Sequence, residues 1–113
     1  MTSYKSGLFA EFLARMYLRM HGFRILKSRY ITGRNTGRAE IDIIARRGNL
    51  IIFCEVKKRR SIECAFEAIS TAQAARLRFA AENYISRISW KGDARFDVIT
   101  LCGWKMQWFQ NVI

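Results

Sequence analysis

The spacing of apolar positions predicts the order of the structural elements. Between positions 6 and 20, apolar residues recur every three or four positions, which predicts a helix that Gly22 ends. Runs rich in β-branched and apolar residues predict strands at 23–27, 40–45, 50–56 and 96–101, with an edge strand or a turn of helix at 106–109. A second long helix is expected from Ser61, as its N-cap, to position 88. The polar, basic and glycine-punctuated segment 32–38 predicts a loop.

This order, αβββαβ with a further short β-strand, predicts a mixed α/β fold in which helices flank a small mixed β-sheet. A chain of 113 residues is long enough for one core, so we expect a single domain over residues 1–113. No apolar run approaches the roughly 18 residues of a membrane span, and the first residues lack the apolar segment of a signal peptide. We therefore expect a cytoplasmic protein without a membrane partner.

The composition of the chain limits the binding partners, metal sites and catalytic groups that can be expected. The 20 Lys and Arg residues against 9 Asp and Glu give a net charge of +11, which predicts attraction to a polyanion. The three cysteines, Cys54, Cys64 and Cys102, lack the spacing of a zinc site, and we expect them to be reduced thiols. With a single histidine in the chain, an enzyme built on this sequence would depend on carboxylates and lysines.

Carboxylates gather on the two strands before and after Gly48. Side chains alternate along a strand, so Glu40 and Asp42 share one face of the first strand, and Glu55 and Lys57 share one face of the next. A two- or four-residue turn centred on Arg47-Gly48 would place Glu40 opposite Glu55 and Asp42 diagonal to Glu55. Because facing like charges destabilise a sheet, a cation is expected there. It is either Lys57 with nearby arginines, in an ion-paired hairpin, or a divalent metal such as Mg²⁺.

The spacing of these residues is similar to a known signature. Asp42 followed by Glu55-Val56-Lys57 resembles the Asp…Glu-x-Lys pattern of the PD-(D/E)xK nuclease superfamily. Over about Gly7 to Leu101 the chain resembles more narrowly the YraN family, small bacterial proteins related to archaeal Holliday junction resolvases. The segments that carry this resemblance are Gly7-Leu-Phe-Ala-Glu11, Gly22-Phe23, Ala39-Glu40-Ile41-Asp42, Phe53-Cys54-Glu55-Val56-Lys57-Lys58-Arg59 and Arg95-Phe96-Asp97-Val98.

The resemblance implies a restriction-endonuclease-like core and a metal-dependent endonuclease that hydrolyses phosphodiester bonds in DNA. It implies one or two Mg²⁺ or Mn²⁺ ions as cofactor, duplex, branched or junction DNA as substrate, and a homodimer as the assembly. The alternative is a catalytically silent nucleic-acid-binding module with the same fold. The charge of +11 suits both.

The resemblance also implies roles for single residues. Asp42 and Glu55 would ligate the metal, together with the backbone carbonyl of Val56. Lys57 would orient and help deprotonate the attacking water, or neutralise the phosphate. Glu11 matches a helix glutamate that contributes to the metal site, although its position alone also allows an ion pair with Arg15, four residues on. Glu40 would be a further metal ligand or an outer-shell group.

Further candidates surround this set. Gln73 stands where the family often has lysine, on a helix stripe that faces the sheet, and is expected to contact phosphate or a metal-bound water, or to be a buried amide. Asp97 is expected to be a structural ion-pair partner, and His21 to interact with the end of the first helix. Basic residues near the hairpin are expected to neutralise DNA phosphates: Arg34, Arg38, Arg46, Arg47, Lys58, Arg59 and Arg60.

Overall fold

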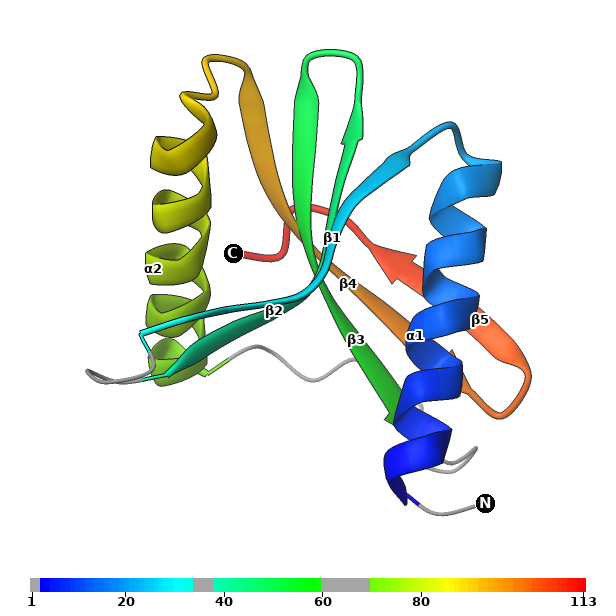
Figure 1. Cartoon of the computed structure of the whole chain (residues 1–113). Helices are drawn as coiled ribbons and strands as arrows, with labels where there is room; N and C mark the ends of the chain where they lie inside the picture. The colour runs from blue at the N-terminus through cyan, green and yellow to red at the C-terminus, as the bar shows by residue number, and fades with distance from the viewer. Residues whose placement is uncertain (1–2, 34–37, 60–69) are drawn as a thin grey trace.

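Helices and strands follow one another in the order that the sequence predicts. The computed structural model describes residues 3–33, 38–59 and 70–113 (Figure 1). The elements in these ranges are α1 (Ser3–Met20), β1 (Arg24–Thr32), β2 (Ala39–Arg47), β3 (Leu50–Arg59), α2 (Thr71–Ile88), β4 (Asp93–Cys102) and β5 (Lys105–Phe109). The mixed α/β fold is thereby confirmed.

The element boundaries differ from those expected. The strands are longer, because pairing with neighbours continues into polar residues; β1, for example, extends to Thr32. Helix α2 begins after Ser70, whose Oγ accepts a hydrogen bond from the Gln73 amide at 3.1 Å. Ser61, the expected N-cap, lies outside the described residues.

The strands form one mixed sheet in the order β1-β2-β3-β4-β5. Every neighbouring pair is antiparallel except β3 and β4, which are parallel. A parallel pair needs a long crossover connection, and α2 lies within it. The two helices cover opposite faces of the sheet (Figure 1), so the carboxylate-bearing strands β2 and β3 lie between helices.

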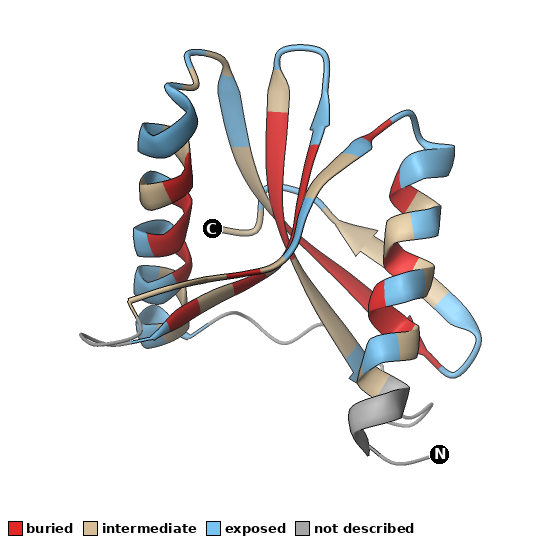
Figure 2. Cartoon of the chain, in the orientation of Figure 1, coloured by how far each residue is buried: buried red, intermediate tan, exposed pale blue. Residues whose placement is uncertain are grey.

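Two apolar cores result, one on each face. Figure 2 shows the buried residues concentrated in the central strands and on the inner sides of both helices. The core under α2 contains Tyr30, Ala39, Ile41, Ile44, Ile51, Phe53, Leu77, Ala80, Ala81 and Tyr84. The core under α1 contains Ala14, Leu18, Phe23, Ile43, Ala45, Ile52, Cys54 and Ile99.

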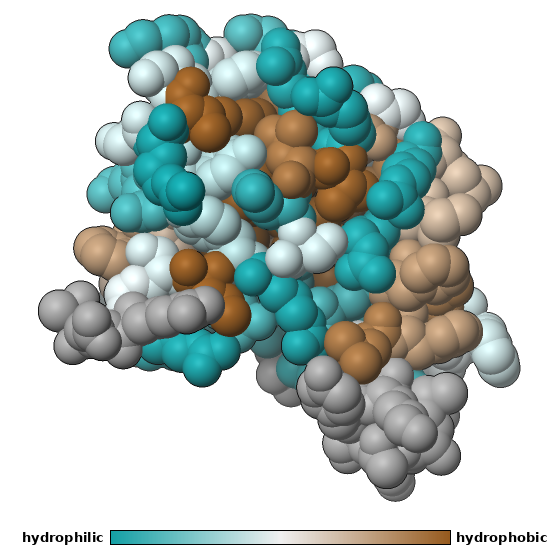
Figure 3. Space-filling model, viewed as in Figure 1, coloured by the Kyte–Doolittle hydropathy of each residue, from teal (hydrophilic) through white to brown (hydrophobic). Residues whose placement is uncertain are grey.

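Helix α1 faces the sheet with small residues. Ala10 and Ala14 are fully buried and allow the helix to approach the sheet closely, which also buries Glu11. The apolar residues that recur along positions 6–20 do not all face the sheet: Met16 and Met20 are exposed, whereas Glu11 is buried. Apolar side chains lie over the outer face of α1 (Figure 3); the exposed ones are Leu8, Phe12, Met16 and Met20.

The hairpin turn sets the register of β2 and β3. Arg47 pairs with Leu50, so the turn consists of Gly48 and Asn49. Gly48 has a φ of 59°, a left-handed conformation that glycine adopts readily at the first position of a type II′ turn. The expected pairing of Glu40 with Glu55 is therefore wrong. With Ile43 paired to Cys54, the register places Asp42 opposite Glu55.

Two further expectations concern the oxidation state of the cysteines and the presence of a membrane-spanning helix. Cys54 is buried and free, as expected, whereas Cys102 is disulfide-bonded, so the expectation of a reduced thiol is wrong for Cys102. Cys64 lies outside the described residues. Across the described residues, neither helix has the length and apolar character needed to span a membrane.

Candidate functional site

Strands β2 and β3 separate next to Asp42. Their pairing ends at Ile43 and Cys54, whereas β3 stays paired with β4 as far as Arg59. Ile41 packs in the core under α2 and Ile43 in the core under α1, although alternation would place both on one face. The backbone of β2 therefore turns at Asp42, and the two strands diverge beyond it (Figure 1).

The Asp42 carboxylate bridges the two diverging strands. The Val56 amide donates a hydrogen bond of 2.8 Å to Asp42 Oδ2, in place of a strand-to-strand bond. The Asp42 and Glu55 carboxyl groups also interact with each other, and a hydrogen bond between them raises the pKa of Glu55 and lowers that of Asp42.

Burial changes the acidity of this pair. It raises the pKa of Glu55 to about 8, with a further increase from the Asp42 charge and a decrease from Lys57. Burial also raises the pKa of Asp42, against the Val56 hydrogen bond, which lowers it. Two adjacent half-buried carboxyl groups thus favour a shared proton or another cation between them.

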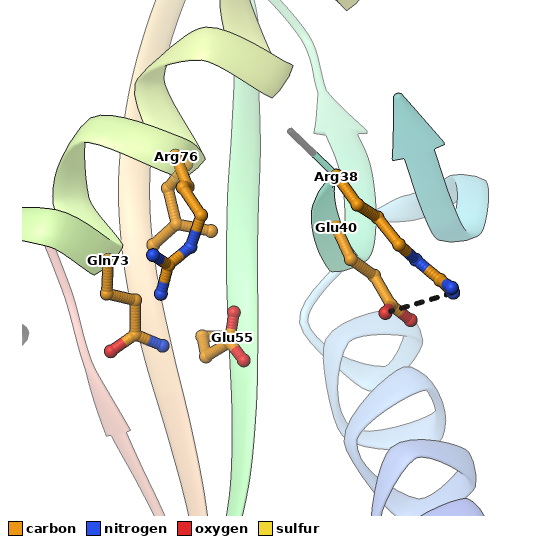
Figure 4. A pocket seen from close by; sticks show the side chains of 6 residues that line it. Arg38, Glu40, Glu55, Gln73 and Arg76 are labelled. Atoms are coloured by element: carbon orange, nitrogen blue, oxygen red, sulfur yellow. Dashed lines mark ion pairs between the residues drawn. The ribbon is translucent and has the colours of Figure 1, made fainter. Parts of the chain in front are cut away.

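A cavity of about 230 Å³ opens beside Glu55. It is lined by Arg38, Glu40, Glu55, Gln73, Arg76 and Leu77. Gln73 and Arg76 extend from α2 toward Glu55, and Glu40 projects from β2 on the other side (Figure 4). Glu40 and Arg38 form a long ion pair of 3.9 Å. The cavity thus combines acidic groups with cationic and amide groups that suit a phosphate.

Glu11 has a different partner from the one its helix position suggests. Its carboxylate accepts hydrogen bonds from Arg29 Nε at 3.0 Å and Arg29 Nη2 at 2.9 Å. The alternative of a pair with Arg15 on α1 is replaced by this contact between α1 and β1. The Glu11 charge raises the pKa of Asp42, so Glu11 remains within electrostatic range of the carboxylate pair.

The donor set fits a hard divalent cation held by few protein ligands. Among the described residues, no group of three or more His, Cys, Asp or Glu side chains is placed to hold a metal ion. Glu11 is instead paired with Arg29 and Glu40 with Arg38. Asp42 and Glu55 remain as an oxygen-donor pair, and Mg²⁺ is commonly held by one or two carboxylates together with water and phosphate.

The basic residues divide into separate groups. Lys57 is half-buried on β3, and its positive charge lowers the pKa of Glu55. Lys58 and Arg59 follow on the same strand, and Arg38 lines the cavity. Arg46 and Arg47 lie at the hairpin end of the sheet, away from the carboxylates. Arg34 and Arg60 lie outside the described residues.

Two residues of the site were missed by the sequence analysis. Arg76 lies three positions after Gln73, on the same helix face, a spacing that could have indicated it. Arg29 carries no such signal, because only the packing of α1 on β1 brings it to Glu11.

The expected structural roles of Asp97, as an ion-pair partner, and of His21, at the end of α1, are confirmed. Asp97 is buried and accepts hydrogen bonds from Arg95 Nε at 2.8 Å, Trp108 Nε1 at 2.8 Å and the Asn111 amide at 3.0 Å. His21 Nδ1 lies 2.8 Å from the Tyr17 carbonyl oxygen, near the end of α1. Both residues thus stabilise the fold.

Comparison with known proteins identifies relatives along most of the chain. A UPF0102 protein of Paramagnetospirillum magneticum is 35% identical over 104 residues, which cover 90% of this chain and 81% of the relative. UPF0102 proteins of Mesorhizobium japonicum and Sinorhizobium medicae are 40% and 41% identical over 105 and 106 residues, covering 91% and 89% of this chain and 81% of each relative. The model of the uncharacterised protein family UPF0102 matches residues 10–101. The resemblance to the YraN family is thus confirmed, and the chain belongs to this family, UPF0102.

Proposed function

We propose that this protein is a metal-dependent endonuclease that hydrolyses phosphodiester bonds in DNA, including branched or junction DNA. The observation that carries the proposal is the Asp42–Glu55 pair at the point where β2 and β3 diverge. Lys57 follows two residues after Glu55 on β3, and α2 presents Gln73 and Arg76 toward the same cavity.

Each of these side chains has a distinct task in the proposed reaction. Asp42 and Glu55 would hold a divalent metal ion, which when bound polarises the phosphate and lowers the pKa of a bound water. Lys57 orients the attacking water through a hydrogen bond, or neutralises charge on the phosphate. Arg76 and Gln73 donate hydrogen bonds to phosphate oxygens, whose negative charge increases in the transition state.

The charge distribution supports a nucleic acid as the substrate. The chain has a net charge of +11 even though acidic groups gather around Asp42. A polyanion is therefore attracted to the molecule as a whole, while its phosphates are repelled from the carboxylate pair until a cation is present. Binding and cleavage are expected to differ in their requirement for metal.

The first test is cleavage of labelled duplex, flap and four-way-junction DNA at low salt with Mn²⁺, Mg²⁺ or EDTA. We expect metal-dependent cutting by the wild type and a loss of at least about 100-fold in Glu55→Gln, the scale of removing one catalytic electrostatic group. Glu82→Gln, which removes an exposed carboxylate of α2, is the matched control and retains cleavage.

DNA binding without cleavage would contradict the proposal. If both wild type and Glu55→Gln bind these DNAs while neither cuts them in any metal, the endonuclease proposal is wrong. The protein is then a nucleic-acid-binding module in which the carboxylate pair is structural.

A further inference from the structure

A second cavity, of about 330 Å³, lies at the hairpin end of β2 and β3. It is lined by Gly22, Arg24, Arg46, Arg47 and Gly48. No carboxylate contributes to its lining, and within the described part of the chain none of its three arginines forms an ion pair. Arg24 and Arg46 are paired directly across β1 and β2, and two neighbouring positive charges without an ion-pair partner among the described residues favour an anion.

Two of these arginines are held in position by their surroundings. Arg46 Nε donates a hydrogen bond of 2.9 Å to the Gly48 carbonyl, and its guanidinium lies 4.7 Å from the centre of the Trp90 ring. Arg47 Nη1 donates a hydrogen bond of 2.8 Å to the His21 carbonyl, and its guanidinium lies 4.4 Å from the centre of the Phe23 ring. Each guanidinium has five N–H donors, so one such bond leaves others for a ligand, and their preorganisation lowers the entropic cost of binding.

Glycine makes this arrangement possible. Gly22 has a φ of 86°, and a Cβ atom built there would lie 3.4 Å from Cδ of Arg47. Gly48 has a φ of 59°, which favours glycine, and its carbonyl accepts the hydrogen bond from Arg46 Nε. Gly22 thus leaves space for the Arg47 side chain against the backbone, whereas the space beside Gly48 is open.

We propose that this cavity, named here the hairpin arginine pocket, binds a backbone phosphate of the nucleic acid at a point separate from the bond that is cut. Four strand positions separate Asp42 from Arg46, a span of about 13 Å at 3.3 Å per residue. The pocket would therefore hold a phosphate at a point on the protein separate from the carboxylate pair.

The inference rests on the nucleic-acid part of the proposed function and is tested without cleavage. Affinity for a labelled duplex is measured by fluorescence anisotropy in EDTA across a range of salt concentrations, for the wild type and for Arg24→Gln/Arg46→Gln. We expect about tenfold weaker binding by the variant at low salt. We also expect the slope of log affinity against log salt to fall by about 1, the value for one lost phosphate contact.

The matched control is Arg78→Gln/Lys105→Gln, which removes the same charge from exposed positions on α2 and β5. An equal loss of affinity in this control would overturn the inference, because net charge alone would then explain the effect. Unchanged affinity and salt slope in Arg24→Gln/Arg46→Gln would overturn it as well. Circular dichroism and thermal unfolding show whether each variant is folded.

Two further measurements separate related explanations. Titration calorimetry with inorganic phosphate tests a free anion as the ligand, and tight phosphate binding with unchanged DNA affinity would overturn the proposed phosphodiester ligand. Cleavage by the wild type and Glu55→Gln is scored separately. A weakened DNA complex in Arg24→Gln/Arg46→Gln supports the pocket even if neither protein cuts DNA.

Discussion

At the scale of single residues, Asp42 makes a contact that a neighbouring strand would otherwise make. Its carboxylate accepts the Val56 amide hydrogen where the ladder between β2 and β3 ends. This satisfies a half-buried backbone donor and brings Asp42 against Glu55, which would repel it if both were ionised. The same contact thus joins the strands and creates a place where a cation is favoured.

This pair predicts a pH-dependent stability that Glu55→Gln changes. The pKa of Glu55 is raised from 4.5 to about 8 in the folded protein, so the folded state binds more protons than the unfolded state between these values. The contribution of Glu55 to stability is complete below its unfolded pKa and is lost as pH rises toward 8. We expect the free energy of unfolding of wild type, relative to Glu55→Gln, to decrease from pH 4.5 to 8.

Urea unfolding in metal-free buffer across this pH range measures that difference. Glu82→Gln, at an exposed position of α2, serves as the control and should parallel the wild type. A constant difference between wild type and Glu55→Gln at all pH values would show that Glu55 has an ordinary pKa.

At the scale of elements, the approach of α1 to the sheet places Glu11 in the interior. Ala10 and Ala14 are buried at the contact, whereas larger side chains such as Phe12 and Met16 are exposed. The Glu11–Arg29 ion pair then links α1 to β1. Helical periodicity alone could not select this face, because apolar residues occur on more than one side of α1.

The close contact predicts that Ala14→Leu destabilises the protein. Ala14 is fully buried, so a larger side chain must displace the helix or its neighbours, at a cost of about 1–3 kcal/mol in the free energy of unfolding. Met16→Leu, at an exposed position on the same helix, should change the value by less than about 0.5 kcal/mol. Urea unfolding compares the two, and equal stability of Ala14→Leu and wild type would contradict the packing described for α1.

At the scale of the whole molecule, positive charge predominates. The net charge is +11; arginines gather without carboxylates at the hairpin end of β2 and β3, and basic residues also lie beside the acidic groups at the other end. Partly buried ion pairs such as Arg95–Asp97 are screened little by salt, whereas repulsion among exposed basic residues is screened strongly.

This distribution predicts that salt stabilises the free protein. We expect the melting temperature to rise as sodium chloride increases from about 0.02 M to about 0.3 M, because screening weakens self-repulsion in the folded state. Differential scanning fluorimetry without DNA or divalent metal measures this. A melting temperature that falls with salt would indicate that exposed ion pairs outweigh the repulsion.

The sequence by itself determined the order of the elements and which two carboxylates, Asp42 and Glu55, lie together. The order follows from periodicities of apolar residues, which reflect burial of one face. Asp42 and Glu55 lie close together, as strand alternation predicts, because a turn of two or of four residues keeps both on one face of the hairpin. Asp97 was likewise recognised as structural from its neighbour Arg95.

Only the tertiary structure decided how these groups meet. The register depends on the conformation of Gly48 and Asn49, which moves Asp42 from a diagonal position to one opposite Glu55. The partner of Glu11 depends on packing between elements distant in sequence, and the divergence of β2 from β3 depends on which neighbour each strand retains. Register, side-chain partners and strand pairing depend on the relative energies of competing long-range contacts. Local sequence patterns do not give these energies.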